Sequence, residues 1–164
     1  MSTETKVQEF AQFINGEWKP GCGGATFDVL NPADGEVVAK ASKATAEDVN
    51  VAVQSAKETF ESGVWSKKSQ KERTQIMLSF AGKIKEHAQE LIYLEGISTG
   101  ATVRKIGGAD IMQLILCLQQ TANMSLKYEM TEHLPVMETF GPNRTQLVRE
   151  PLGVVAAITP FNFP

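Results

Sequence analysis

The sequence has few side chains that bind metals tightly. Its 164 residues include only two cysteines and two histidines. Cys22 and Cys117 are far apart and form neither a CxxC pair nor a zinc spacing. His87 and His133 add no cluster of ligands, so the sequence argues against a structural zinc site. Cys117 lies in the apolar run 115–118, and we interpret it as a small packed hydrophobe.

Basic charge and long apolar runs are also scarce. The chain has 16 Lys+Arg against 19 Asp+Glu, a net charge of -3, which argues against nucleic-acid binding by a basic surface. No run of about 18 apolar residues occurs, so no membrane span is predicted. Residues 1–10 lack the apolar core of a secretory signal, and we expect a cytoplasmic protein. With 42% hydrophobic and 21% charged residues, the composition is that of a soluble globular protein of one-domain length.

The glycine motifs that cradle phosphates are missing. Neither GxGxxG nor GxxxxGK occurs in the chain, although these are the standard nucleotide-binding loops. One hypothesis is a generic nucleotide-binding α/β domain, which would give this chain affinity for a dinucleotide. The missing loops argue against that hypothesis.

The first part of the chain is predicted to be β structure. Asn15-Gly16 stands between the apolar residues of 13–18, and this dipeptide suits the positive φ angles of a type I′ turn. A second reversal is predicted at 31–35 (NPADG), because proline presets φ and glycine accepts a left-handed position. That turn separates the strands 27–30 and 36–39.

Three helices are predicted next. A capping-box pattern begins the first, over 45–63, and a second capping box begins another over 69–97, which ends at Ser98-Thr99-Gly100. The third pattern covers 106–128, is apolar on more than one face and should be substantially buried or covered by a partner. Gly107-Gly108 weakens it near its start.

The last part returns to β structure. Two strands, 137–140 and 145–149, are predicted around the turn 141–143, in a β section that begins at Pro135. The run 153–158 is continuously apolar, as in a strand buried on both faces of a parallel sheet. Since no other segment offers a second strand of that kind, we interpret the chain as the first part of a larger protein.

Asn162 is the candidate catalytic residue. In open α/β sheets, ligands bind beyond the carboxyl ends of the strands, and Asn162 follows the predicted strand between Pro160 and Pro164. A stiff loop that presents an amide donor suits an oxyanion hole. The alternative is a turn residue that bonds the local backbone.

The order of several short motifs resembles the N-terminal part of the NAD(P)-dependent aldehyde dehydrogenase superfamily. Each early motif is weak alone, but their order and spacing together are specific. The motifs are FINGEW at 13–18, NPADGEV at 31–37, GVW at 63–65, TG at 99–100, REPLGVV at 149–155 and PFNFP at 160–164.

The resemblance implies an α/β fold of β hairpins, three helices, a β arm and the start of a parallel Rossmann-type sheet. Residues 1–134 would form the N-terminal part of an NAD(P)-binding domain. Residues 135–148 would belong to an arm used in homodimers or homotetramers. Residues 149–164 would give the first strand of the cofactor-binding sheet and the loop of the catalytic asparagine, with the catalytic domain outside this chain.

The resemblance also implies a chemistry. Asn162 matches the asparagine that stabilises the oxyanion of a thiohemiacetal, while NAD or NADP takes up a hydride from the aldehyde. The backbone that lines the nicotinamide side would be that of Ile158, Thr159, Pro160 and Phe161, with Asn162 beside it.

The chain departs from the family pattern at three positions. Phe161 replaces a commoner Trp, and Ser98 and Ala101 replace an Asp and a Lys. Neither Cys22 nor Cys117 matches the nucleophile, so we expect the 164-residue chain alone to be inactive. An alternative is a non-catalytic interaction or oligomerisation module with the same fold.

Overall fold

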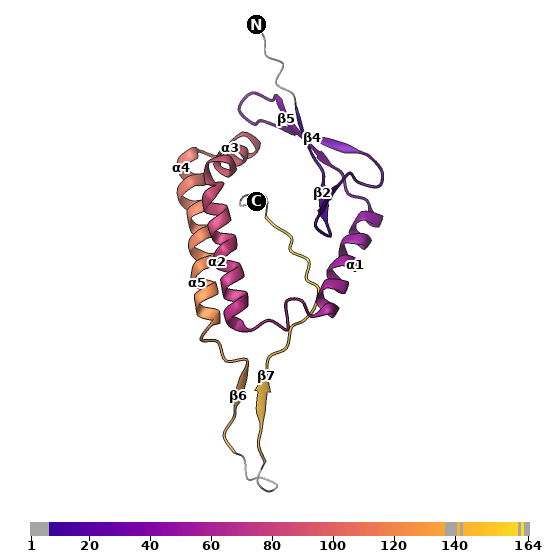
Figure 1. Cartoon of the computed structure of the whole chain (residues 1–164). Helices are drawn as coiled ribbons and strands as arrows, with labels where there is room; N and C mark the ends of the chain where they lie inside the picture. The colour runs from indigo at the N-terminus through magenta and orange to yellow at the C-terminus, as the bar shows by residue number, and fades with distance from the viewer. Residues whose placement is uncertain (1–6, 137–140, 142, 161, 163–164) are drawn as a thin grey trace.

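The computed structural model describes residues 7–136, 141, 143–160 and 162. Figure 1 shows the strands near the N-terminus at one end and the β6–β7 hairpin at the other. Helices α2 and α5 run side by side, α1 lies across from them, and the segment after β7 passes between the two. The fold is therefore mixed α/β, as predicted, and most of its elements surround the C-terminal segment.

Two small sheets form the N-terminal end. The strand β5 (Val37–Ser42) lies between β1 (Gln8–Phe10), which is parallel to it, and β4 (Thr26–Leu30), which is antiparallel. The antiparallel hairpin of β2 (Gln12–Ile14) and β3 (Glu17–Lys19) turns through 15–16.

Both predicted β turns are confirmed. Asn15 has φ 55° and Gly16 has φ 78°, the positive values that a type I′ turn requires. In the second turn the backbone N–H of Gly35 donates to the Asn31 carbonyl at 2.8 Å. The Asn31 side chain also accepts from the N–H of Ala33 at 3.0 Å. Turns of this kind depend on residues close in sequence, which is why the sequence predicts them.

The capping boxes are also confirmed. The helix α1 (Ala46–Ser62) begins after Thr45, whose side chain caps the first turn, and ends at Gly63 with φ 74°. The helix α2 (Gln70–Glu86) begins after Ser69 with the same reciprocal arrangement. In each box a hydroxyl and a carboxylate satisfy backbone donors that the first helical turn leaves unpaired.

The second predicted helix is in fact two helices. The backbone leaves helical geometry at His87, with φ -97° and ψ 11°, and α3 (Ala88–Thr99) begins there. Leu91 and Ile92 of α3 pack on the same core cluster as Ile84 of α2. Both helices present apolar residues to one core, so the apolar pattern continues through His87. For that reason the pattern alone predicts one helix where the structure has two.

The third predicted helix divides as well. Within the predicted range 106–128 lie a π-helical turn η1 (Ile106–Ile111) and α5 (Met112–Ser125), and the short helix α4 (Val103–Lys105) precedes them. The glycine pair at 107–108 lies in the π turn, a wider turn that often marks functional positions.

The apolar core is small and lies where these helices meet. Ile106, Ile111 and Ile115 are buried in it. Cys117 is exposed, so our interpretation of it as a packed hydrophobe is wrong.

The predicted C-terminal strands differ from the structure. An antiparallel hairpin pairs β6 (Thr131–His133) with β7 (Gln146–Val148), so its first strand precedes Pro135. The strand predicted at 137–140 lies outside the described residues. Within the described ranges, no helix is long and apolar enough to cross a bilayer.

The strand predicted at 153–158 is absent from the described structure. Residues 149–160 have no strand assignment, and Val155 is 73% exposed. A strand requires a hydrogen-bonded neighbour, and none of the described strands pairs with this run. The apolar composition of residues 153–158 predicts that they are buried, but the described residues do not cover them.

Candidate functional site

Asn162 lies in a turn at the end of the segment that follows β7, and its side chain is exposed. Ile158, Thr159 and Pro160 precede it; they are exposed and belong to no helix or strand. Phe161, which we predicted to line a cofactor site with them, lies outside the described residues. The structure thus brings together a short apolar backbone run and an amide donor, both accessible.

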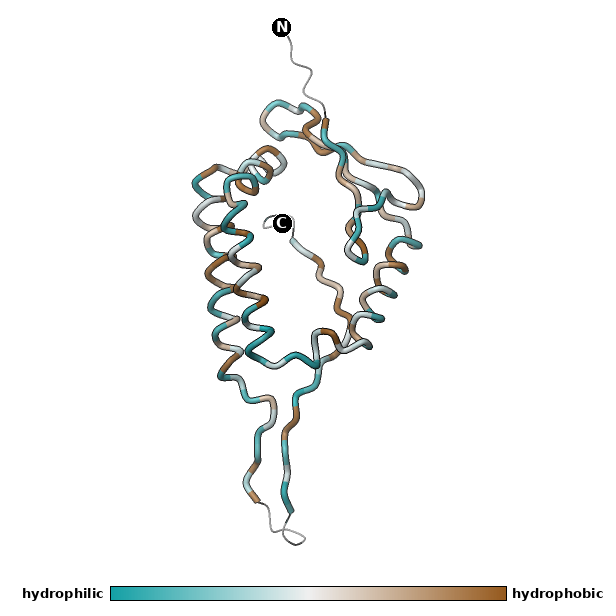
Figure 2. Tube along the Cα trace, in the orientation of Figure 1, coloured by the Kyte–Doolittle hydropathy of each residue, from teal (hydrophilic) through white to brown (hydrophobic). Residues whose placement is uncertain are grey.

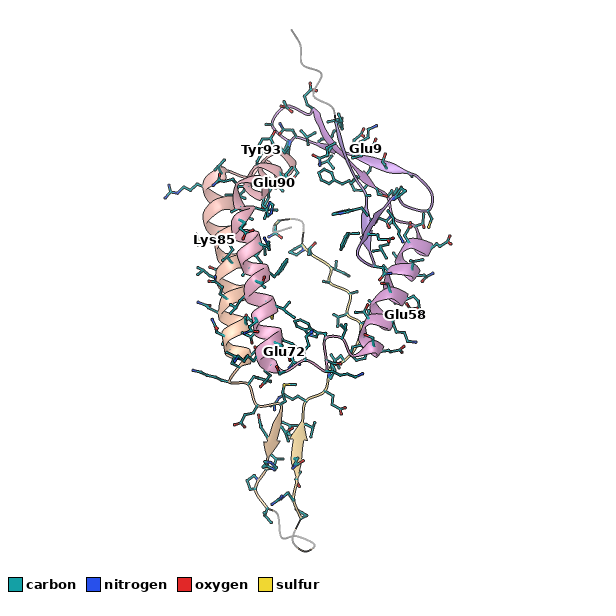
Figure 3. All side chains as sticks on the ribbon, in the orientation of Figure 1. Glu9, Glu58, Glu72, Lys85, Glu90 and Tyr93 are labelled. Carbon is teal, nitrogen blue, oxygen red and sulfur yellow. The ribbon has the colours of Figure 1, made fainter. Side chains whose placement is uncertain are left out.

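Side chains flank this segment from two directions. Figure 3 shows the segment between α1, where Glu58 is labelled, and α2, where Glu72 and Lys85 are labelled, with side chains of both helices around it. The segment itself is one of the more apolar parts of the chain in Figure 2. Ile158 is 94% exposed, so the site has one open apolar side.

The base of the segment is anchored by Arg149. Its backbone N–H donates to the Met130 carbonyl at 2.9 Å, and its guanidinium donates to the Glu129 carbonyl at 3.1 Å. The same guanidinium pairs with the Glu132 carboxylate at 2.7 Å and lies 5.2 Å from the ring centre of Tyr128. The hydrogen bond to Glu132 raises the pKa of Arg149. These contacts determine where the segment leaves the α5–β6 junction.

A cavity of about 570 Å³ lies at that base. Phe60 and Trp65 contribute its aromatic side, while Arg73 and Arg149 contribute cations. Gly153 also lines it and has φ 111°, a value that favours glycine. The cavity adjoins the start of the segment, so it is distinct from the Asn162 end.

The described thiols belong to other parts of the fold. Cys22 lies beside Asp48 at the start of α1, and its backbone N–H donates to that carboxylate at 2.9 Å. Cys117 lies on α5, where Gln113 contacts its sulfur at 3.2 Å. The residues at the Asn162 end can donate hydrogen bonds and line one wall of a ligand site, but among the described residues no thiol nucleophile accompanies them.

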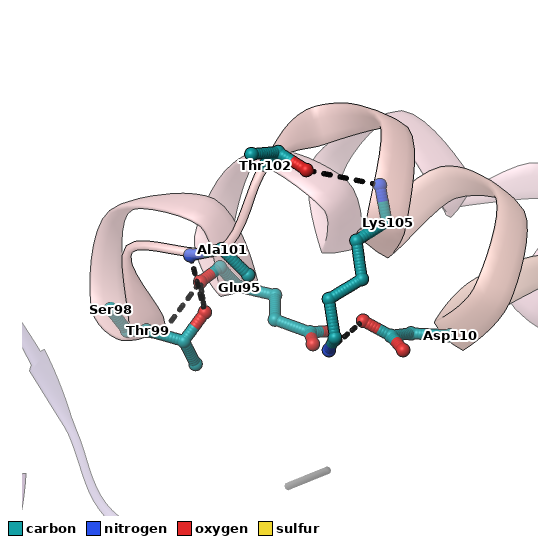
Figure 4. Close-up of polar contacts among 7 residues, drawn as sticks. All are labelled: Glu95, Ser98, Thr99, Ala101, Thr102, Lys105 and Asp110. Atoms are coloured by element: carbon teal, nitrogen blue, oxygen red, sulfur yellow. Dashed lines mark hydrogen bonds and ion pairs between the residues drawn. The ribbon is translucent and has the colours of Figure 1, made fainter. Parts of the chain in front are cut away.

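A second polar cluster was not predicted from the sequence. Lys105 pairs with Asp110 at 2.8 Å, and Glu95 lies next to them (Figure 4). The contacts of Arg149 were not predicted either, although Arg149 is the first residue of the motif REPLGVV at 149–155. Both clusters join residues from different elements, so sequence spacing carries no signal for them.

Comparisons with known proteins agree with the motif resemblance. The chain matches the aldehyde dehydrogenase family over residues 18–164. An aminoacetaldehyde dehydrogenase of Pseudomonas aeruginosa is 37% identical over 153 residues, which are 93% of this chain and 30% of the relative. The chain therefore spans about a third or less of the curated relatives that it matches.

Solved structures give the same result. The indole-3-acetaldehyde dehydrogenase of P. syringae in complex with NAD+ superposes with a TM-score of 0.88 and 35% identity, covering 98% of this chain and 32% of that one. A betaine aldehyde dehydrogenase of Staphylococcus aureus in complex with NAD+ gives a TM-score of 0.84 and 34% identity, covering 94% of this chain and 30% of that one. Sequence motifs, family match and superposed backbone agree over nearly all of the chain, which belongs to the aldehyde dehydrogenase family.

Proposed function

We propose that this chain works as the N-terminal segment of an NAD(P)+-dependent aldehyde dehydrogenase. The enzyme would oxidise an aldehyde to a carboxylic acid through a thiohemiacetal and a thioester on a cysteine outside this chain. One observation carries the proposal: an exposed asparagine, Asn162, ends the segment that follows β7, within the region that matches the family.

Asn162 would stabilise the oxyanion. When a thiolate adds to the aldehyde carbon, negative charge moves onto the aldehyde oxygen, and the Asn162 side-chain N–H would donate to it. A preorganised donor of this kind contributes about 10²–10³ in rate. Its exposure in the chain leaves the amide free to face a substrate.

The backbone of Ile158, Thr159, Pro160 and Phe161 would line one side of the nicotinamide. The described part of this run is exposed and not paired in a sheet, so it fits one wall of a cofactor site. NAD(P)+ would accept the hydride when bound. The NAD+ in the two neighbouring structures supports this assignment.

The arm predicted at 135–148, whose strand β7 pairs with β6, would take part in a homodimer or homotetramer. Its hairpin projects from the helices, at the end of the structure opposite the strands near the N-terminus (Figure 1). The position of the hairpin and the family to which the chain belongs support a role in oligomerisation. An antiparallel hairpin with two free edges can pair with another chain.

The test uses the complete protein that contains this segment. Asn162→Ala should lower kcat of that protein by about 10²–10³. In the 164-residue chain the substitution should leave the unfolding midpoint unchanged, because the side chain is exposed there. Asn123→Ala on α5, also exposed, is the matched control and should keep wild-type kcat. A loss of less than a few-fold in Asn162→Ala removes that residue from the catalytic role.

The 164-residue chain alone provides a second test. It should produce no NADH from aldehyde and NAD+, since no described thiol accompanies Asn162. Turnover by the purified chain would overturn the assignment of the nucleophile to another segment. A reading frame without a cysteine-containing catalytic segment would instead favour the interaction module.

A further inference from the structure

A buried carboxylate oxygen in the π turn lacks a visible donor. The Asp110 side chain is only 10% exposed, and its Oδ2 pairs with the Lys105 ammonium at 2.8 Å. Its Oδ1 is fully shielded and has no hydrogen-bond partner among the described residues. Leaving a buried acceptor unpaired is costly, so the site calls for one more donor.

Glu95 is placed to supply that donor. It lies on α3 and, with Asp110, lines a cavity of about 410 Å³. Figure 4 shows the Glu95 side chain extending toward Lys105 and Asp110. A protonated carboxyl has one O–H donor, whereas an ionised one only accepts.

The surroundings of the Glu95 carboxyl favour its protonated form. Burial raises the pKa of Glu95, the neighbouring Asp110 carboxylate raises it further, and the positive charge of Lys105 lowers it by less. Two neighbouring carboxylates cannot both ionise without mutual repulsion. One proton removes that repulsion and also satisfies Oδ1.

We infer that Glu95 and Asp110 bind one proton between them and so form a carboxyl–carboxylate hydrogen bond that joins α3 to the π turn. Glu95 donates its O–H and Asp110 Oδ1 accepts. The remaining negative charge is balanced by Lys105 through Oδ2. This is a proton-binding site in the helical part of the fold, remote from the proposed oxyanion donor in sequence and in function.

The charged groups that act on Glu95 come from two elements. Asp110 belongs to η1 and Lys105 to α4. Strand β4 also contacts α3, and its charged residue, Asp28, is not among the groups that shift the Glu95 pKa. On α3 itself, the Glu90 carboxylate lies 3.1 Å from the His87 ring at the exposed start of the helix.

The site couples pH to the stability of the core. The π turn joined by the proton carries Ile106 and Ile111 of the buried cluster. Because the folded chain holds the Glu95 proton to a higher pH than the unfolded chain, stability should fall as pH rises from the ordinary Glu pKa of 4.5 through the raised pKa.

Urea unfolding of the full chain across pH tests the inference. Glu95→Gln keeps an N–H donor for Asp110 but cannot ionise. It should therefore lose the decline in unfolding midpoint that the wild type shows above pH 4.5. Glu36→Gln, at an exposed turn, should follow the wild-type profile. A Glu95→Gln profile parallel to the wild type would overturn the inference.

A measurement on the wild type does not depend on the variant folding. Carbon-detected NMR of the Glu95 carboxyl should give a titration midpoint above 4.5. In Asp110→Asn that midpoint should move down, because the like charge is gone while Lys105 remains. A wild-type midpoint at or below 4.5 contradicts a shared proton.

Discussion

The carboxylate of Asp48 accepts the backbone N–H of Cys22 at 2.9 Å and so ties the loop before β4 to the first turn of α1. The same carboxylate accepts the backbone N–H of Thr45 at 2.7 Å and its hydroxyl at 2.8 Å. One buried side chain therefore completes the helix cap and closes a contact across 26 residues.

Asp48→Asn should destabilise the chain in a pH-dependent way. Hydrogen bonds from Thr45 and Cys22 hold the pKa of Asp48 well below its usual 3.8. The stabilisation is present above pH 3.8 and is lost as pH falls further, because the unfolded chain takes up the proton first. At neutral pH the variant should unfold about 3–6 °C lower by circular dichroism, and the difference should shrink in acid. A constant difference at every pH would contradict the role of the charge.

The two exposed thiols should react at different rates. The Asp48 carboxylate accepts a hydrogen bond from the Cys22 thiol and, with partial desolvation of the sulfur, raises the pKa of that thiol. Thiolates are the reactive species, so Cys117 should react several-fold faster with a disulfide reagent at neutral pH. Cys22→Ser and Cys117→Ser each leave one thiol to be timed, and Asp48→Asn should accelerate the Cys22 reaction. Equal rates in both serine variants contradict this prediction.

Ile106→Ala should be among the more destabilising core substitutions. Ile106 is fully buried at the start of the π turn and packs with Ile111 and Ile115. Removing a buried Ile side chain leaves a cavity and costs about 2–5 kcal/mol of unfolding free energy. Val103→Ala in the preceding α4, where the side chain is 71% exposed, should change it by less than about 0.5 kcal/mol in the same urea titration.

Gly100→Ala should destabilise the junction between α3 and the 31–35 turn. Gly100 has φ 71°, and an added Cβ would lie 3.1 Å from Pro32 Cβ. The left-handed conformation alone costs an alanine about 1–2 kcal/mol. Gly108→Ala is the matched control, since open space surrounds its Cβ position, and chemical unfolding should show no loss of stability there. Equal losses in the two variants would rule out the left-handed strain as the cause.

Local interactions made much of the fold predictable from the sequence. The turns at 15–16 and 31–35 and the two capping boxes form between residues at most a few positions apart, so their residue types carry the signal. The short motifs and their order also predicted the aldehyde dehydrogenase family, which the comparisons confirm. The role of Asn162 stays a prediction, since it depends on more than the exposed turn in which the residue lies.

Tertiary contacts decided what the sequence left open or led us to misjudge. The parallel pairing of β1 with β5, the break at His87 and the proton site at Glu95 depend on elements that meet only after folding. The apolar run 153–158 has the composition of a buried strand, yet it forms none among the described residues. The amino-acid sequence by itself determines local geometry and the preference of each segment for burial, whereas pairing, protonation and burial are decided by which groups the tertiary structure brings into contact.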